Sequence, residues 1–409
     1  MKLSFSEIKR LLPIAKRRVA TTVVQWVQRM LSDEKIIRNV YKTDSPRRVL
    51  LCHLPEAFAN KVQPKHHSNL TECCVIARCF HRLGYCVDCT SRAKTGIDYS
   101  GYDIVMGING NAFFNSISPD ASVRPLRIFY SVGAETCFNY RMTALRNRDF
   151  YNRHGRWLLA SNRYMPGDAR NYYEANFADA VICLGDEYVL GKFIEEDSRI
   201  DKFKLLPAFY FPVAKPDEKK DFSLCRRNIL WFGSSGMLHK GLDIAIDFAL
   251  SHPQFTLHVC GGSRQESDFW HYYQPKIKGV SNIVMHGFVD IESKRFASIL
   301  EMCGILLNPS ISEGCAVSVL NVLGNGALLP ICSSATGVDF GDAGIRVEEV
   351  SYEAFEQALL LADAMPVEKF AQKAWDAHRY VHDNCSLEQF EERMFGFIQD
   401  IIGENKNKE

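Results

Sequence analysis

With 409 residues, 24% of them charged and 46% hydrophobic, the chain has the size and composition of a globular protein with two domains, each able to bury its own core. The net charge of +1 does not indicate that the chain as a whole binds a nucleic acid or a strongly acidic partner. No apolar run reaches the roughly 20 residues that a membrane-spanning helix needs, and the N-terminus is not recognised as a signal peptide.

The first 45 residues form a basic segment that is predicted to be helical. Between Met1 and Arg48, twelve Lys/Arg stand against four acids, and apolar residues such as Trp26 lie beside basic ones such as Arg29. An amphipathic basic helix of this kind can lie on an anionic membrane surface. A cap packed on the next domain, with its charges in solvent, explains the pattern equally well, so both interpretations stay open.

From residue 46 to 213, strand-like and helix-like segments alternate. Short apolar runs predict strands at 48–54, 85–90, 102–108, 127–133, 179–185 and 204–210. The aromatic and arginine-rich stretch 138–157 is interpreted as an amphipathic surface helix, with binding of a sugar or an anionic lipid head as the alternative. This region is predicted to be the first domain.

The polar, charged stretch 214–228 is interpreted as a linker that opens a second domain, 214–388. Strands are predicted at 228–235, 255–262, 282–289, 304–310, 328–333 and 344–350, with helices between them. Continuous apolar strands that alternate with helices indicate an α/β fold with doubly wound parallel sheets. Residues 367–402 are predicted to be helical throughout, and segment 389–409 is expected to pack back on the first domain.

The fourteen cysteines are scattered through predicted strands and helices, which is typical of reduced, buried thiols in a cytosolic protein. Five of them lie close together with three histidines between positions 66 and 89. A zinc site would need ligands that converge from a knuckle, whereas Cys73 to Cys79 fall on a predicted helix and Cys86 and Cys89 on a strand. Core packing is therefore favoured over a metal site.

Four strand ends of the second domain carry chemistry suited to an anionic ligand, because ligands of doubly wound sheets bind outside the carboxyl ends of the strands. At 232–243 a Gly/Ser loop leads to Lys240 at a helix start, which suits a diphosphate. The glycines of VCGG (259–262) allow a ligand to approach the backbone closely, and HGFV (286–289) could present backbone groups to a nucleobase. The fourth end is SEGCAVSVLNVLGNG (312–326), where Glu313 lies in a small-residue turn before an apolar helix.

These pieces together resemble the nucleotide-sugar domain of the family 4 retaining glycosyltransferases, which have the GT-B fold. The resemblance covers residues 228–345 through FG…HKGLDIAI, LHVCGG, NIVMHGFV and NPSISEG…GNGALLPICSSATG, in the family's order. In the first domain it is limited to the strand and helix rhythm and to FADAVICLGD. The resemblance implies two Rossmann-like domains facing each other across a cleft, with the donor held by the second and the acceptor by the first.

The resemblance also implies roles for individual residues. Glu313 matches the first glutamate of the family's E-x7-E motif, which contacts the donor sugar, and Lys240 matches the lysine that neutralises the diphosphate. Backbone amides at 314–318 are expected to add to that neutralisation. The residues expected to bind the donor are Gly233, Ser234, Ser235, Lys240, Gly261, Gly262, Arg264, Gly287, Phe288, Val289, Glu313, Gly314, Cys315, Ala316, Val317 and Asn321.

Two positions depart from the family's pattern. The second glutamate of E-x7-E falls at Asn321, whose amide can donate and accept and would bind the ribose more weakly. The arginine that usually precedes the lysine by six residues falls at Ser234, so Arg264 is expected to compensate.

In the first domain, His67, Ser68 and Asn69 open the first helix and are candidates for the acceptor or phosphate side. Ser68 and Asn69 are equally good helix caps. Glu135, at another strand end, is a candidate catalytic base on the acceptor side, or it begins the next helix. Catalysis is otherwise expected to rest on Glu313 and Lys240.

The cysteine pattern indicates a cytoplasmic protein, with segment 1–45 as a candidate contact with the inner face of a membrane. The resemblance implies an enzyme. It would move a sugar from a nucleotide sugar, with UDP- or GDP-sugars favoured, to a glycan or lipid-linked glycan. No cofactor and no metal ion are expected. The alternatives are a non-catalytic GT-B partner of another glycosyltransferase, which Ser234 and Asn321 would suit, and a GT-B epimerase or phosphorylase.

Overall fold

The computed structural model describes residues 36–59, 67–117, 124–158, 170–197, 199–262 and 266–406. These residues form two six-stranded parallel sheets, with strand orders β2-β1-β3-β4-β5-β6 and β12-β11-β10-β7-β8-β9. The first sheet contains β1 Arg48–His53, β2 Cys86–Ser91, β3 Ile104–Gly107, β4 Leu126–Ser131, β5 Ala180–Leu184 and β6 Phe203–Leu206. The second contains β7 Asn228–Gly233, β8 Thr256–Gly261, β9 Ile283–Gly287, β10 Ile305–Asn308, β11 Leu329–Ser333 and β12 Ile345–Val347.

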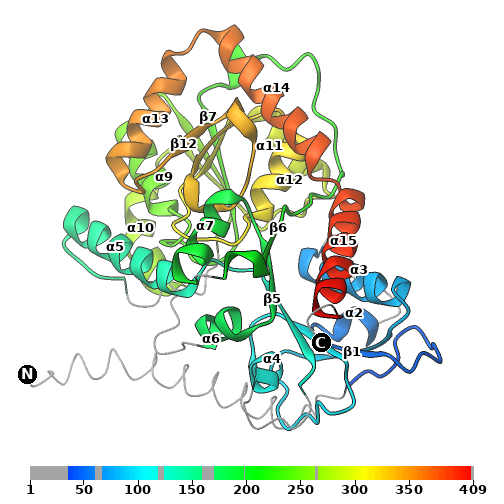
Figure 1. The fold of residues 1–409 in the computed structure, drawn as a ribbon. Coiled ribbons are helices and arrows are strands. Elements are labelled where there is room, and N and C mark those ends of the chain that lie inside the picture. The colour runs from blue at the N-terminus through cyan, green and yellow to red at the C-terminus, as the bar shows by residue number, and fades with distance from the viewer. Residues whose placement is uncertain are drawn as a thin grey trace, which may run out of the picture.

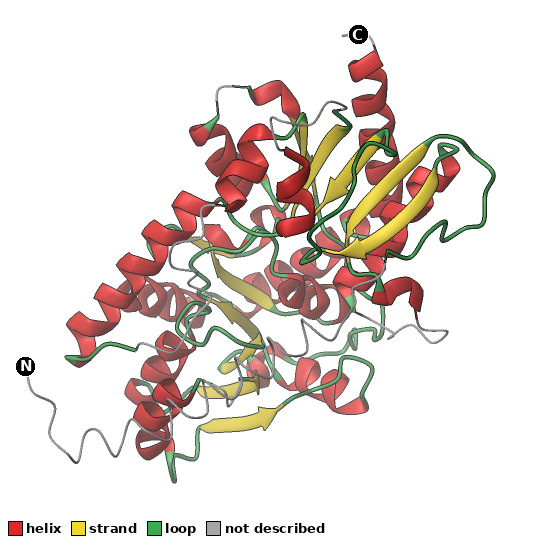
Figure 2. Ribbon diagram, turned by 90° about the horizontal axis from the view of Figure 1, so that it is seen from below, coloured by secondary structure: helices red, strands yellow, loops and turns green. Residues whose placement is uncertain are grey.

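Helices cover both faces of each sheet, as Figure 2 shows from below. The helices of the first half are α2 Glu56–Ala59, α3 Ser68–Arg82, α4 Asn111–Phe114, α5 Thr136–His154, α6 Arg170–Phe177 and α7 Glu187–Glu196. Those of the second half are α8 Phe222–Cys225, α9 Leu242–Ser251, α10 Ser267–Ile277, α11 Lys294–Met302, α12 Val317–Asn325, α13 Tyr352–Ala364, α14 Val367–Asn384 and α15 Leu387–Lys406. The prediction of two doubly wound parallel sheets is confirmed.

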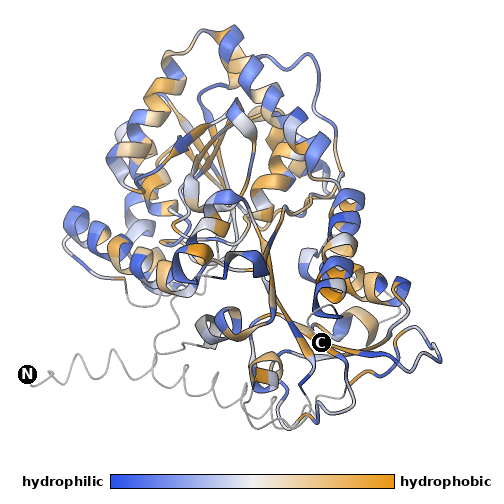
Figure 3. Ribbon diagram, viewed as in Figure 1, coloured by the Kyte–Doolittle hydropathy of each residue, from blue (hydrophilic) through white to orange (hydrophobic). Residues whose placement is uncertain are grey.

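The strands form where the sequence has continuous apolar runs, because both faces of each sheet are covered. In β5, all five residues are buried. Hydropathy colouring shows the same pattern, with apolar strands inside and polar outer helix faces (Figure 3). The strand predicted at 204–210 ends early, at Leu206. Pro207 follows and has no N–H to continue the ladder.

The stretch 367–402 is helical as predicted, except for a break at residues 385–386. α14 ends at Asn384 and α15 begins at Leu387. Ser386 and Gln389 cap α15 reciprocally: the Gln389 N–H donates to Ser386 Oγ at 3.2 Å, and the Ser386 N–H donates to Gln389 Oε1 at 3.3 Å. The break turns α15 toward the first sheet, where it lies beside α3 (Figure 1). There Arg78 donates to both carboxylate oxygens of Glu391, at 3.2 and 2.6 Å.

α5 has an exposed face, as expected for 138–157, but its buried face, which includes Phe150, lies against the second domain. α5 leaves the first sheet and packs against α9 and α10 of the second domain (Figure 1). Phe150 is fully buried in the same apolar cluster as Trp231 of β7. Arg146 and Arg153 both form ion pairs with the fully buried Asp243 of α9, at 2.5 Å in the case of Arg153. Arg146 and Arg153 therefore join the two domains.

The basic segment lies mostly outside the described residues, since residues 1–35 are not among them. Among the helices that are described, none is both long enough and apolar enough to cross a membrane. All fourteen cysteines are free thiols, and most are buried. Cys73 of α3 and Cys89 of β2 pack with their sulfur atoms 4.0 Å apart.

Candidate functional site

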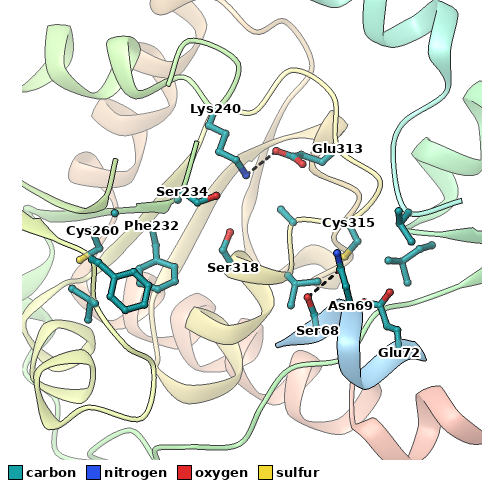
Figure 4. Close-up of a pocket in the computed structure, with 18 residues that line it drawn as sticks. Ser68, Asn69, Glu72, Phe232, Ser234, Lys240, Cys260, Glu313, Cys315 and Ser318 are labelled. Carbon is teal, nitrogen blue, oxygen red and sulfur yellow. Dashed lines mark hydrogen bonds and ion pairs between the residues drawn. The ribbon is translucent and has the colours of Figure 1, made fainter. Parts of the chain in front are cut away.

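A cavity of about 480 Å³ lies between the two domains, at the carboxyl ends of the strands. Its second-domain wall is formed by the ends of β7, β8 and β9 and by the turn that leads into α12. Its first-domain wall includes the first turns of α3 (Figure 4). The residues that line it are Ser68, Asn69, Glu72, Val132, Leu184, Phe232, Gly233, Ser234, Lys240, Cys260, Gly261, Phe288, Val289, Glu313, Cys315, Ala316, Val317 and Ser318.

Lys240 and Glu313 form an ion pair on the second-domain wall. Lys240 Nζ lies 2.9 Å from Glu313 Oε1, and the two side chains are only 7% and 6% exposed. Ser310 Oγ also donates to Glu313 Oε1, at 2.9 Å. Charges this far from water are retained only where they are paired and hydrogen-bonded. The structure thus brings together two residues that lie on separate strand ends in the sequence.

The loops around Lys240 are held in position by backbone contacts. Gly261 has φ +90°, and a Cβ atom there would lie 1.7 Å from the carbonyl oxygen of Gly233, so only glycine fits. Glu266 accepts hydrogen bonds from the backbone N–H groups of Gly236 and Met237, the latter at 2.8 Å. These contacts fix the loop after β7.

The turn before α12 also forms part of the contact between the domains. A Cβ atom on Gly314 would lie 2.6 Å from the carbonyl oxygen of Val132, so this turn approaches the first domain backbone to backbone. Two of the amides expected to face a ligand are already engaged. The Ala316 N–H donates to the Thr336 carbonyl at 2.9 Å, and the Val317 N–H donates to the Cys315 carbonyl at 3.0 Å.

Asn321 does not line the cavity, which corrects its expected role at a ribose. Its Oδ1 accepts the backbone N–H of Phe211 at 2.9 Å, in the connection between the two domains. Ser318 lies one turn earlier on α12 and does line the cavity. Four other expected residues are also absent from the lining: Ser235, Gly262, Gly287 and Gly314. Arg264 lies outside the described residues.

Glu135 and His67 act as helix caps. Both oxygens of Glu135 are used, because they accept the backbone N–H groups of Cys137 and Phe138 at 2.9 and 2.6 Å. Burial raises the pKa of Glu135, and these hydrogen bonds oppose that shift. His67 Nδ1 accepts the Leu70 N–H at 3.4 Å and caps α3. Neither residue lines the cavity, so Glu135 is not placed as a base there.

Six lining residues were not predicted from the sequence: Glu72, Val132, Leu184, Phe232, Cys260 and Ser318. A signal for Glu72 was available. It follows Ser68 and Asn69 by four and three residues, the spacing that places side chains on one helix face. Ser318 was within reach as well, as the residue directly after the predicted run 313–317. The other four are apolar or thiol side chains at strand ends, and nothing in their type marks a site.

Comparisons with known proteins inform the fold. The chain matches no protein-family profile and no curated protein sequence. Among solved structures, it resembles sucrose-phosphate synthase from Thermosynechococcus elongatus, with 13% identity over 87% of this chain and 99% of the other and a TM-score of 0.62. It also resembles Anabaena Alr3699/HepE in complex with UDP and glucose, with 12% identity, coverage of 86% and 99% and a TM-score of 0.57.

A glycosyltransferase from Rickettsia africae ESF-5 is similar to the same degree, with 13% identity, coverage of 87% and 99% and a TM-score of 0.57. At such low identity these likenesses describe the architecture, which is the GT-B arrangement of two Rossmann-like domains.

Proposed function

We propose that the protein is a glycosyltransferase that moves a sugar from a nucleotide sugar to a glycan or lipid-linked glycan. The donor is a UDP- or GDP-sugar held by the second domain, and the acceptor enters from the first. The observation that carries the proposal is the buried ion pair between Lys240 and Glu313. The pair lies in the cavity between the domains, on the wall formed by the second domain. A cavity of about 480 Å³ is within the range of small-molecule sites.

Lys240 supplies the charge that a diphosphate needs. It is the only Lys or Arg among the described residues that line the cavity. Ser234 stands where a second cation, an arginine, would help to bind the diphosphate. When a donor enters, its diphosphate attracts Lys240, and Glu313 becomes able to accept hydrogen bonds from the sugar hydroxyls. One buried pair thus serves two parts of the donor without a metal ion.

The proposed transfer retains the configuration at the anomeric carbon. The acceptor hydroxyl attacks that carbon as its bond to the diphosphate breaks, and the leaving phosphate takes the hydroxyl proton. Such a reaction depends on positioning and on electrostatic stabilisation of the departing phosphate. Lys240 provides that stabilisation at the second-domain wall.

The similar structures support the choice of donor. HepE was solved in complexes whose ligands are UDP, UDP with glucose, and UDP-glucose. UDP-glucose is therefore the first donor to test. One observation favours a second candidate, a non-catalytic partner of another glycosyltransferase: Asn321 does not line the cavity, and its side-chain oxygen accepts the Phe211 N–H.

The test is turnover by the purified chain alone. UDP-glucose, UDP-N-acetylglucosamine, GDP-mannose and ADP-glucose are each incubated with it and with octyl β-glucoside as the acceptor, and the released nucleoside diphosphate is measured. We expect one of these donors to be consumed and to raise the melting temperature. Binding without turnover would support the non-catalytic partner, and neither binding nor turnover with any donor would contradict the proposal.

Phe288 provides a prediction about how the nucleobase of the donor is bound. Its side chain is 86% exposed although it lines the cavity, which suits a ring that stacks on a nucleobase. Stacking of a nucleobase on an aromatic ring is worth about 1–3 kcal/mol, so Phe288→Ala is expected to weaken UDP binding roughly 5- to 150-fold. Pyrophosphate binding should not change, since it has no base. Calorimetric titration of both ligands measures the difference.

Leu224 offers the matched control, since it is 78% exposed and does not line the cavity. Leu224→Ala should leave both affinities unchanged. Equal losses for UDP and pyrophosphate in Phe288→Ala would contradict stacking.

A further inference from the structure

A buried carboxyl group lies on the first-domain wall of the cavity. Glu72, in the second turn of α3, is 1% exposed and lines the cavity together with Ser68 and Asn69. Figure 4 shows it on the opposite side of the cavity from Lys240, with Ser318 and Cys315 between them. A carboxyl group is costly to bury and is therefore seldom found in such a place without a role.

The neighbours of Glu72 leave part of its hydrogen-bonding capacity unused. The Tyr130 hydroxyl, at the carboxyl end of β4, donates to Glu72 Oε2 at 3.0 Å. Within the described residues, Oε1 has no hydrogen bond of its own. Beside them His53, at the end of β1, is 3% exposed, and neither of its ring nitrogens has a hydrogen bond within the same residues. Buried polar groups that serve only the fold are normally satisfied, so Glu72, the member of this cluster that lines the cavity, is suited to a ligand.

Charge separates this wall from the diphosphate. Lys240 lies on the second-domain wall, and a phosphate bound there is kept from Glu72 by repulsion between like charges. A carboxylate instead attracts hydroxyl groups, with which it forms short, charge-assisted hydrogen bonds. The first-domain wall therefore suits a neutral ligand that is rich in hydroxyl groups.

We infer that Glu72 binds the acceptor, accepting a hydrogen bond from a hydroxyl group of a carbohydrate seated between α3 and α12, with Tyr130 as a positioning residue. The inference rests on the proposed function and adds to it the side chain that binds a hydroxyl group of the acceptor. No proton is transferred to Glu72, because the leaving phosphate takes it.

The inference has a pH signature. Burial raises the pKa of Glu72, whereas His53 of β1 and the hydroxyl of Tyr130 oppose the shift; Cys73 of α3 adds to the shift. Cys315 faces the carboxyl group from the second domain. Glu72 accepts a hydroxyl well only when ionised, so acceptor binding should weaken as the pH falls through this raised pKa. Binding of the donor at the opposite wall should not follow that titration.

The experiment compares wild type with Glu72→Gln, which keeps the shape and an oxygen for Tyr130. The donor is the nucleotide sugar that the wild type consumes, and the acceptors are octyl β-glucoside, octyl β-galactoside and octyl α-mannoside. Transfer to each acceptor, hydrolysis of the donor by water, and UDP binding are measured between pH 5 and 8. Glu187→Gln, an exposed carboxylate of α7, is the matched control.

In Glu72→Gln we expect the KM for the acceptor to rise roughly 10- to 100-fold, the loss of a hydrogen bond to a charged group. Donor hydrolysis and UDP affinity should stay within about twofold of the wild-type values, a change too small for a lost hydrogen bond. The rise of the acceptor KM at low pH (the acid limb of its pH profile) should disappear. Tyr130→Phe should raise the acceptor KM in the same direction but less.

Three results would overturn the inference while the proposed function stands. They are an unchanged ratio of transfer to hydrolysis in Glu72→Gln, an unchanged acid limb, and donor consumption by the wild type with no transfer to any of the three acceptors. A wild type that neither binds nor consumes a nucleotide sugar would instead overturn the proposed function, and the inference with it.

Discussion

Replacing Lys240 by methionine is expected to lower kcat/KM for the donor by about 10²- to 10³-fold, the loss typical of one electrostatic contact to a transition state. Methionine keeps the length of the side chain and removes the only Lys or Arg found among the described lining residues. The departing diphosphate would then lose its partner at the second-domain wall. Steady-state kinetics with the identified donor, and UDP titration, measure the effect.

Removing Lys240 alone also leaves Glu313 buried and without this cation, which costs stability whatever the function. The double variant Lys240→Met/Glu313→Gln separates the two effects, because it removes both charges. We expect it to recover the melting temperature without recovering activity. Lys369→Met, at an exposed lysine of α14, is the matched control. Activity near that of the wild type in the double variant would contradict the role of the pair.

Asp243→Asn is expected to lower the free energy of unfolding by about 3 kcal/mol, near the lower end of the 3–5 kcal/mol found when a buried ion pair loses one partner. Asp243 is fully buried and pairs with Arg146 and Arg153 of α5. Asparagine keeps the shape but leaves two arginines with less negative charge. Asp149 still contacts both arginines, which keeps the loss near that lower end. Chemical denaturation measures the change.

The ion pairs of Asp243 with Arg146 and Arg153 also make the free energy of unfolding depend on pH. Burial by itself would raise the pKa of Asp243, but Arg146 and Arg153 hold it below its ordinary value of 3.8. Because the pKa is lower in the folded state, this stabilisation is complete above the unfolded pKa and is lost as the pH falls through the folded one. Wild type should therefore lose its advantage over Asp243→Asn only below about pH 4, near the unfolded pKa of an aspartate.

Glu353→Gln is the control for this prediction, since Glu353 of α13 is an exposed carboxylate. It should change the free energy of unfolding by no more than about 0.5 kcal/mol. A denaturation midpoint of Asp243→Asn equal to that of wild type would show that α5 is not held by this pair.

The second-domain wall of the site was predictable from short stretches of sequence. Gly233, Lys240, Gly261 and Glu313 each follow or adjoin an apolar run that forms a strand. Parallel strands joined by helices bring their carboxyl ends to one edge, so residues at those ends converge without further information. Position relative to a strand was sufficient there, and the prediction of the sheets was correct for the same reason.

Prediction was weaker wherever the direction of a side chain decided its role. Asn321 and Ser318 both lie on α12, yet the first bonds to Phe211 and the second lines the cavity. Glu135 has the residue type of a catalytic base, yet both of its oxygens cap α5. Glu72 was overlooked inside a helix that also carries three cysteines.

The sequence by itself determined the two parallel sheets, their order along the chain and the glycine, lysine and glutamate positions at the strand ends, because those features depend on local periodicity and on chain topology. Only the tertiary structure decided that Lys240 pairs with Glu313, that Glu72 faces them across the cavity and that α5 is bound to the second domain through Arg146 and Asp243. Each of these depends on contacts between segments distant in sequence. The energy of a buried charge is set by which partner reaches it, and residue type alone does not specify that partner.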